Sequence, residues 1–181
     1  MKGVFTIIIS FLIVHFSNAQ HTARFLEFIK DLEVVSCEAD TTFYKNGKVR
    51  RISCRTTYEY NSDNYSVGTG RIVQYYKNGH IANEYCLDNY GNIKRIEIFN
   101  RKGNKVEDYL TTEIDSNAKS LDEFLESHDH ISYKTFSQFY RFSKKMETYF
   151  LYKEGQIVNG NKNGVWTTYY DNGEMKKEKK Y

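Results

Sequence analysis

Residues 42–51 read TFYKNGKVRR, and the stretches QYYKNGHIAN at 74–83 and TYYDNGEMKK at 168–177 align with them without a gap. Each contains an aromatic residue, a tyrosine, any residue, Asn-Gly, any residue and an apolar residue, in that order. Recurrence of a short pattern along a chain is typical of repeat proteins, in which each repeat is one small unit of secondary structure. We therefore expect this unit to describe most of the fold.

Asn-Gly between alternating residues is the strongest short-range signal for a β-hairpin, because both central positions of a type I′ turn need positive φ. A two-residue loop at Asn46 and Gly47 places Tyr44 opposite Val49. The equivalent loops at Asn78-Gly79 and Asn172-Gly173 place Tyr76 opposite Ile81 and Tyr170 opposite Met175. Weaker turn signals at 89–92 and 102–104 extend the pattern through the middle of the chain. The sequence thus predicts a β-meander with one repeated aromatic-aliphatic contact.

The similarity continues upstream of the third stretch. The pattern Gly-x-Trp-x-x-Tyr-Tyr-x-Asn-Gly is formed there by Gly164, Trp166, Tyr169, Tyr170, Asn172 and Gly173. It resembles the MORN repeat variant of bacterial proteins labelled YwqK-family antitoxins. The match covers residues 150–181 well, 68–106 fairly, and 38–52 in part, where Glu38 and Asp40 replace the Gly and Trp. The resemblance implies a twisted, elongated antiparallel sheet of hairpins, with no catalytic residues to carry over.

The remaining segments predict helices and a leader. Residues 1–19 have a positive start, an apolar stretch and a small-residue cleavage site, so we expect a signal peptide that is removed before Gln20. Apolar spacing over 22–32, after a cap at Thr22, predicts a short amphipathic helix within a lead-in of residues 20–36. A capping box at Ser120 to Glu123 predicts a helix inside an insertion at about 115–142.

The prediction for the fold is therefore mainly β: an elongated antiparallel sheet of MORN-like hairpin repeats with a short N-terminal helix and one helical insertion. Residues 37–181 would form a single repeat domain. After removal of the leader, the chain contains 25 Lys and Arg and 23 Asp and Glu, which gives a formal charge of +2. A charge this small does not indicate nucleic-acid binding.

Three cysteines remain in a compartment that permits disulfides. If Ala39 pairs with Cys54 across the first hairpin, Cys37 lies diagonally from Cys54 on the same face. We therefore expect either a Cys37–Cys54 bond or three reduced, buried thiols that include Cys86.

Motifs that carry chemistry are missing from the sequence. There is no Gly-x-Ser-x-Gly, His-Glu-x-x-His or Walker pattern. His128-Asp129-His130 offers two metal ligands where a closed site needs three or four. We therefore expect no catalytic residue, no metal and no cofactor.

The resulting functional prediction is an exported, periplasmic or extracellular, non-enzymatic module that binds another protein through a tyrosine-rich sheet. Two alternatives stay open at this point: an antitoxin or immunity-like protein that neutralises a toxin by binding, and a protein that binds or hydrolyses cell-surface polysaccharide. No stable membrane insertion is expected once the leader is removed. The oligomeric state is open.

Overall fold

The computed structural model describes residues 20–127 and 130–181, so the predicted signal peptide at 1–19 lies outside the described residues. The elements, in chain order, are β1 (Gln20–His21), α1 (Ala23–Ile29), β2 (Glu33–Phe43), β3 (Val49–Tyr60), β4 (Asp63–Tyr75), β5 (Ile81–Leu87), β6 (Ile93–Phe99), β7 (Lys105–Ser116), α2 (Leu121–Glu126), β8 (Ile131–Ser143), β9 (Thr148–Val158), β10 (Asn161–Tyr169) and β11 (Met175–Lys180). Within the described chain, no helix is long and apolar enough to cross a bilayer.

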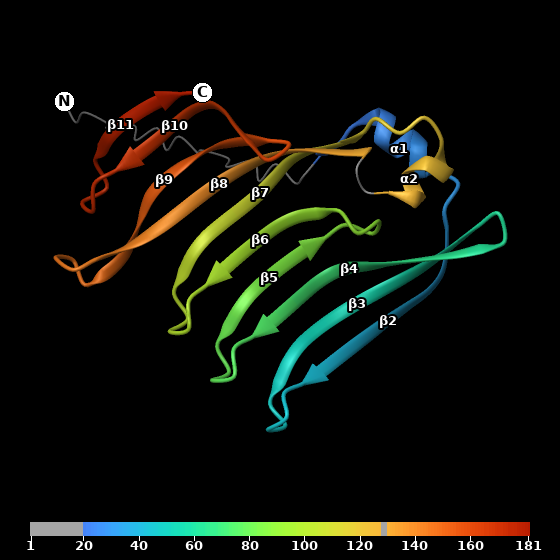
Figure 1. The fold of residues 1–181 in the computed structure, drawn as a ribbon, viewed down its shortest axis with the longest axis horizontal. Coiled ribbons are helices and arrows are strands. Elements are labelled where there is room, and N and C mark those ends of the chain that lie inside the picture. Colours follow the sequence, from blue (N-terminus) through green and yellow to red (C-terminus); the bar gives the residue numbers. More distant parts are fainter. Residues whose placement is uncertain (1–19, 128–129) are drawn as a thin grey trace, which may run out of the picture.

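Strands β2 to β11 form one open antiparallel sheet, and each strand pairs with its neighbours in sequence (Figure 1). The short β1 pairs in parallel with β7 and stands outside this order. In Figure 1 the chain sweeps across the sheet from β2 at one edge to β11 at the other. The predicted mainly β meander is therefore confirmed.

The geometry of the Asn-Gly turns differs from the prediction. In the first hairpin the Tyr44 N–H donates to Lys48 O at 2.8 Å and the Gly47 N–H donates to Tyr44 O at 2.9 Å. Gly47 has a φ of +79°, whereas Asn46 is not among the residues of positive φ. These bonds define a three-residue loop, a type I turn followed by a left-handed glycine, in place of a type I′ turn.

This loop changes the cross-strand partners. Phe43 lies opposite Val49, and Tyr44 faces Lys48 instead of Val49. The corresponding partners in the other two repeats are Tyr75 with Ile81 and Tyr169 with Met175, so the predicted pairs Tyr76–Ile81 and Tyr170–Met175 are also wrong. The type I′ conformation does occur in this protein, at Asn61-Ser62 and at Asn159-Gly160, where both residues of each loop have positive φ.

The second tyrosine of the repeat links neighbouring hairpins. The Tyr44 hydroxyl donates to the carbonyl of Tyr75 at 2.6 Å, and the Tyr76 hydroxyl donates to the carbonyl of Phe99 at 2.8 Å. Asn78 adds a bond from its side-chain amide to Arg101 O at 2.7 Å. These two turns are thus tied to the turn region of the next hairpin in addition to the backbone ladder.

The two helices pack together against the far ends of β7 and β8. Thr22 caps α1 by accepting the Phe25 N–H at 3.2 Å, and Ser120 caps α2 by accepting the Glu123 N–H at 3.2 Å, as the sequence predicts. Phe25 is fully buried, and it forms a core with Ile29, Ile114, Ala118 and Phe124. Partly buried apolar side chains, among them Phe28, Leu125 and Tyr133, pack against this cluster.

The helical insertion is much shorter than the predicted 115–142. Helix α2 covers only Leu121–Glu126, and residues 131–143 form β8. The aromatic spacing in 136–142 fits either a helix or a strand, and pairing with both β7 and β9 selects the strand.

The turn geometry makes a testable distinction between the two residues of the Asn-Gly pair. We expect Gly47→Ala to lower the free energy of unfolding by about 1 kcal/mol or more, because alanine at positive φ is strained. A Cβ at Gly47 would touch nothing within 4 Å, so the effect would come from the backbone alone. Asn46→Ala should cost less than about 0.5 kcal/mol. Equal losses in urea denaturation would instead support a type I′ turn.

Candidate binding surface

Two uninterrupted rows of paired residues cross the sheet and define its faces. One row contains Thr41, Ile52, Val73, Glu84, Glu97, Asp108, Gln138, Glu154, Thr167 and Glu178. The other contains Thr42, Arg51, Gln74, Asn83, Ile98, Glu107, Phe139, Lys153, Thr168 and Lys177. Because side chains alternate along a strand, the rows lie on opposite faces. We call them the acidic face and the lysine face.

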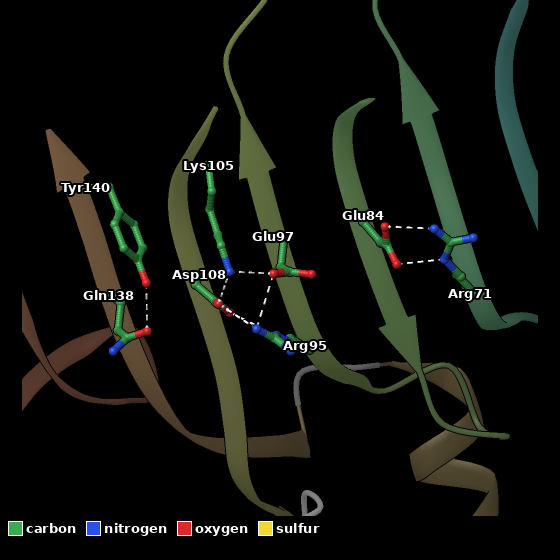
Figure 2. Close-up of polar contacts among 8 residues, drawn as sticks. All are labelled: Arg71, Glu84, Arg95, Glu97, Lys105, Asp108, Gln138 and Tyr140. Carbon is green, nitrogen blue, oxygen red and sulfur yellow. Dashed lines mark hydrogen bonds and ion pairs between the residues drawn. The ribbon is translucent and has the colours of Figure 1, made fainter. Parts of the chain in front are cut away.

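Cations pair with the carboxylates of β5 to β7 on the acidic face (Figure 2). On β4 and β5, Arg71 binds Glu84 with two parallel bonds of 2.6 and 2.9 Å. On β6 and β7, Arg95 binds Asp108 in the same bidentate way at 2.6 and 3.0 Å. Bidentate pairing fixes the orientation of both side chains, so these bonds reinforce the strand register.

Lys105 completes the network between β6 and β7. Its Nζ lies 2.7 Å from Glu97 Oε1 and 2.9 Å from Asp108 Oδ2, and Arg95 also reaches Glu97 at 3.2 Å (Figure 2). Burial by itself would raise the pKa of Asp108, but the hydrogen bonds from Arg95 and Lys105 outweigh burial and hold the pKa below its ordinary value. Asp108 is thereby held in the ionised form, and Glu97 lies beside it in the same network of hydrogen bonds.

The row continues on β8 to β10 with neutral donors. The Tyr140 hydroxyl donates to Gln138 Oε1 at 3.1 Å, and the Gln138 amide donates to Glu154 Oε2 at 2.9 Å. Tyr169, one of the predicted repeat residues, donates its hydroxyl to Glu154 Oε1 at 2.5 Å. The acidic face therefore has its central carboxylates bonded within the protein, and they are not free to take up an outside cation.

On the lysine face, Trp166 of β10 is packed over Gly155 of β9. Trp166 is only 1% exposed, and its Nε1 donates to Gln156 O at 3.0 Å. A Cβ at Gly155 would lie 2.4 Å from the indole ring, so this position has room only for glycine. Phe139 and Tyr109 extend the aromatic contacts, with ring centroids 6.1 Å apart for Phe139–Trp166 and 5.8 Å apart for Tyr109–Phe139.

Lysines surround this indole. The ammonium groups of Lys153 and Lys162 lie 5.1 and 4.8 Å from the centre of the Trp166 ring. Lys162 and Lys179 lie 5.0 and 4.5 Å from the centre of the Tyr181 ring. The proximity of Lys162 lowers the pKa of Lys153, because a neighbouring positive charge disfavours a second one. No ion pair joins any of these three lysines to a carboxylate among the described residues.

An open groove of about 430 Å³ runs beside these residues. Its lining includes Phe139, Arg141, Tyr152, Lys153 and Lys162. Glu107 is the acidic residue of the lining. Glu107 accepts a hydrogen bond from Tyr109, and Arg141 lies 3.6 Å above the centre of the Tyr152 ring. We call the groove and the lysines around Trp166 the aromatic–basic surface.

A second groove, of about 300 Å³, lies on the same face towards the helices. Apolar side chains of Ile93, Ile96 and Ile157 contribute to its lining together with Tyr109. Tyr109 thus contributes to this apolar groove and contacts Phe139 of the aromatic–basic surface.

Most of the predicted repeat residues have structural positions. Gly47, Gly79 and Gly173 occupy the left-handed turn position, and Gly164 also has positive φ. Asn46, Asn78 and Asn172 accept hydrogen bonds from the backbone N–H groups two residues on, at 3.3, 3.2 and 3.1 Å. Of the repeat residues only Trp166 contributes to the groove, and Tyr170, 48% exposed, lies outside its lining. Sequence reasoning missed the lysines around Trp166, because they come from three strands that no motif connects.

The cysteines do not form the expected bond. Cys54 does lie opposite Ala39, as predicted, yet all three cysteines are free thiols. Cys37 and Cys86 are exposed, so the alternative of three buried thiols is also wrong. Of His128-Asp129-His130 only His130 is described, and it lies 3.3 Å from Glu123. Among the described residues no cluster of His, Cys, Asp and Glu is arranged to hold a metal ion.

Comparisons with known proteins do not identify a family for this chain. No family model matches the chain, and no curated protein matches it. Among solved structures it is similar to the crystal structure of a DUF3836 family protein from Parabacteroides distasonis, at 12% sequence identity. That match covers 70% of this chain and 89% of the other, with a TM-score of 0.18, and a likeness this weak carries no argument.

The network around Asp108 predicts a pH-dependent contribution to stability. A carboxyl whose pKa is lowered by folding stabilises the protein above its ordinary pKa of 3.8 and loses that effect as the pH falls through the folded value. We expect Asp108→Asn to lower the free energy of unfolding by about 1–2 kcal/mol at pH 7, since Arg95 is partly exposed.

The difference between wild type and Asp108→Asn should shrink below about pH 4. Denaturation at a series of pH values measures it, with Asp63→Asn at an exposed hairpin tip as the control. A difference that stays constant down to pH 2 would mean that packing, and not charge, is lost in the variant.

Proposed function

We propose that this chain is an exported, non-enzymatic protein-interaction module whose aromatic–basic surface binds an acidic segment of a partner protein. The observation that carries the proposal is the cluster of Lys153, Lys162 and Lys179 around Trp166 and Tyr181, which has no carboxylate partner among the described residues. Ammonium groups this close repel one another, so an anionic ligand would be stabilised there.

Several features of the surface favour a protein as that ligand. Tyr152, Phe139 and Arg141 line the groove, and aromatic residues and arginine are the types enriched where protein interfaces gain most of their affinity. The neighbouring apolar groove offers contact area beside the charged region. The rings are held rigidly on strands, so they lose little freedom on binding.

We further propose that the hairpins are MORN-like repeats, on the strength of the recurring aromatic-Tyr-x-Asn-Gly unit and the linking hydrogen bonds of Tyr44 and Tyr76. In this interpretation the repeats supply a rigid sheet, and the individual residues of the C-terminal hairpins supply the specificity. The repeat itself does not identify the partner.

Charge reversal tests the binding site. The double variant Lys153→Glu/Lys162→Glu should weaken binding to the partner by about tenfold or more, because it removes two cations and adds two repulsive charges. The control is Lys45→Glu/Lys48→Glu, which makes the same change of charge on the exposed turn of the first hairpin. Each variant is used to capture partners from the envelope fraction of the cells that naturally make this protein, and each captured partner is then titrated individually. Circular dichroism checks that each variant is folded.

A protein retained by wild type and control but lost with Lys153→Glu/Lys162→Glu would support the proposal. Equal retention by all three proteins would contradict it. Retention of material that withstands protease and is removed by glycosidase would favour a polysaccharide over a protein.

Export makes a separate prediction. The chain recovered from cells that express the full coding sequence should begin at Gln20, because the preceding Ser17-Asn18-Ala19 fits a signal-peptidase site. Cell fractionation followed by N-terminal sequencing measures this. Recovery of the intact chain from the cytosol would rule export out.

A further inference from the structure

The sheet has two edges that no strand covers in the described chain. Ten of the eleven residues of β2 are exposed, as are all six of β11. An uncovered edge presents unpaired N–H and C=O groups, which can pair with another strand. The chain contains no proline, so neither edge has this residue to block pairing.

The two edges carry opposite charges. Strand β2 has three acids, Glu33, Glu38 and Asp40, and no basic residue. Strand β11 has four lysines and a single acid, Glu178. Each edge therefore repels a copy of itself, while the two edges attract one another.

The number of strands gives the edges a compatible direction. Strands β2 to β11 are consecutive antiparallel neighbours, so β11 runs opposite to β2. A second copy placed beside the first in the same orientation would bring its β2 antiparallel to β11, and the meander would continue without a reversal. A sheet with an odd number of such strands would give a parallel pairing instead.

The faces also match across the junction. Asp40 and Glu38 lie on the same face as Thr42, because they alternate along β2 without a break in register. Lys177 and Lys179 lie on that lysine face too, opposite Thr168 and Trp166. In the continued sheet the acids and the lysines are therefore on the same side.

Backbone hydrogen bonding limits the possible registers. The Tyr44 N–H points towards the β3 side, where it donates to Lys48 O just before β3, so the alternating N–H groups of Cys37 and Ala39 point outward. The Tyr181 N–H points to β10, where it donates to Gly164, so the N–H groups of Glu178 and Lys180 point outward. Pairing Glu178 with Ala39 and Lys180 with Cys37 joins outward groups to outward groups.

The same register pairs Lys177 with Asp40 and Lys179 with Glu38. These pairs occupy the non-hydrogen-bonded positions of an antiparallel ladder, where opposing side chains come closest. It also brings Phe43 and Met175, which are 59% and 60% exposed, to the same end and the same face of the junction. Charge, direction, face and backbone hydrogen bonding all agree on this one register.

We propose that the chain assembles head to tail, with β11 of one copy pairing antiparallel with β2 of the next. The sheet then continues from copy to copy, and the partner that fits each free edge is a second copy of this chain. A contact of this kind joins different surfaces of identical subunits, so it yields open chains, or rings where the rotation closes, instead of a symmetric dimer. It engages Lys179 of the aromatic–basic surface, leaves Lys153 and Lys162 of that surface uncovered, and does not depend on the proposed function.

Proline variants with one blocked edge test the proposal. Ala39→Pro removes an outward N–H of β2, and Glu178→Pro removes an outward N–H of β11, so each spares the hydrogen bonds inside its own sheet. The chain recovered from cells that express the full coding sequence is studied by analytical ultracentrifugation from micromolar to roughly millimolar concentration. We expect concentration-dependent oligomers for wild type, monomers for each variant alone, and a species of two chains, no larger, for their equimolar mixture.

Charge variants provide a second test that leaves the backbone unchanged. Glu38→Lys/Asp40→Lys and Lys177→Glu/Lys179→Glu should each be monomeric, and their mixture should regain long oligomers because both kinds of junction are then complementary. Wild-type oligomers should weaken in about 0.5 M salt, where exposed charges are screened.

Other outcomes overturn the proposal. A wild-type monomer at every concentration would mean that the edges do not pair. A dimer that persists in Glu178→Pro and is lost in Ala39→Pro would mean that β2 pairs with a second β2. A circular-dichroism spectrum typical of the wild type is required of every variant, and the charge variants decide the question if a proline variant fails this check.

Discussion

A glycine at positive φ in each repeated turn is the constraint on which this sheet depends. The connections after β2, β4, β5, β6 and β10 each contain one such glycine. These are Gly47, Gly79, Gly91, Gly103 and Gly173, and their φ values lie between 79° and 93°. The left-handed residue sets the loop length, and the loop length sets which residues of the two strands face one another. A loop one residue shorter would move every side chain of the following strand to the other face.

The constant turn geometry has consequences across the whole sheet. Because the glycine turns of β4 to β7 share one geometry, Glu84, Glu97 and Asp108 fall in one row although they are distant in sequence, and Glu154 joins this row through β8 and β9. Arg71, Arg95 and Lys105 then lie near enough to neutralise three of these acids. The Tyr44 and Tyr76 hydroxyls form similar lateral bonds at the turns, where each donates to a backbone carbonyl of the next hairpin. The helices cover only one region of this sheet, so elsewhere these lateral bonds hold the strands together without a second layer.

Local patterns predicted the hairpins and the helix caps at Thr22 and Ser120, because these depend on residues close in sequence. The turn type was wrong because Asn-Gly is compatible with two geometries: Asn159-Gly160 adopts the predicted one, and Asn46-Gly47 does not. Residues 131–143 were ambiguous because their aromatic spacing fits a helix or a strand, and only pairing with β7 and β9 decides. The lysines around Trp166 could not be predicted, since their proximity depends on the register of three strands and on the bulge between Asn163 and Thr167.

The two faces present different electrostatic fields to an approaching molecule. On the acidic face, Glu84, Glu97 and Asp108 form short ion pairs whose fields largely cancel at a distance. On the lysine face, Lys153, Lys162 and Lys179 have no such partner among the described residues, so their fields add. A formal net charge of only +3 for the whole chain therefore conceals one strongly positive region. Long-range attraction of an anionic partner depends on this local excess of positive charge and not on the net charge of the chain. A nearly neutral protein can therefore still attract such a partner to one end of one face.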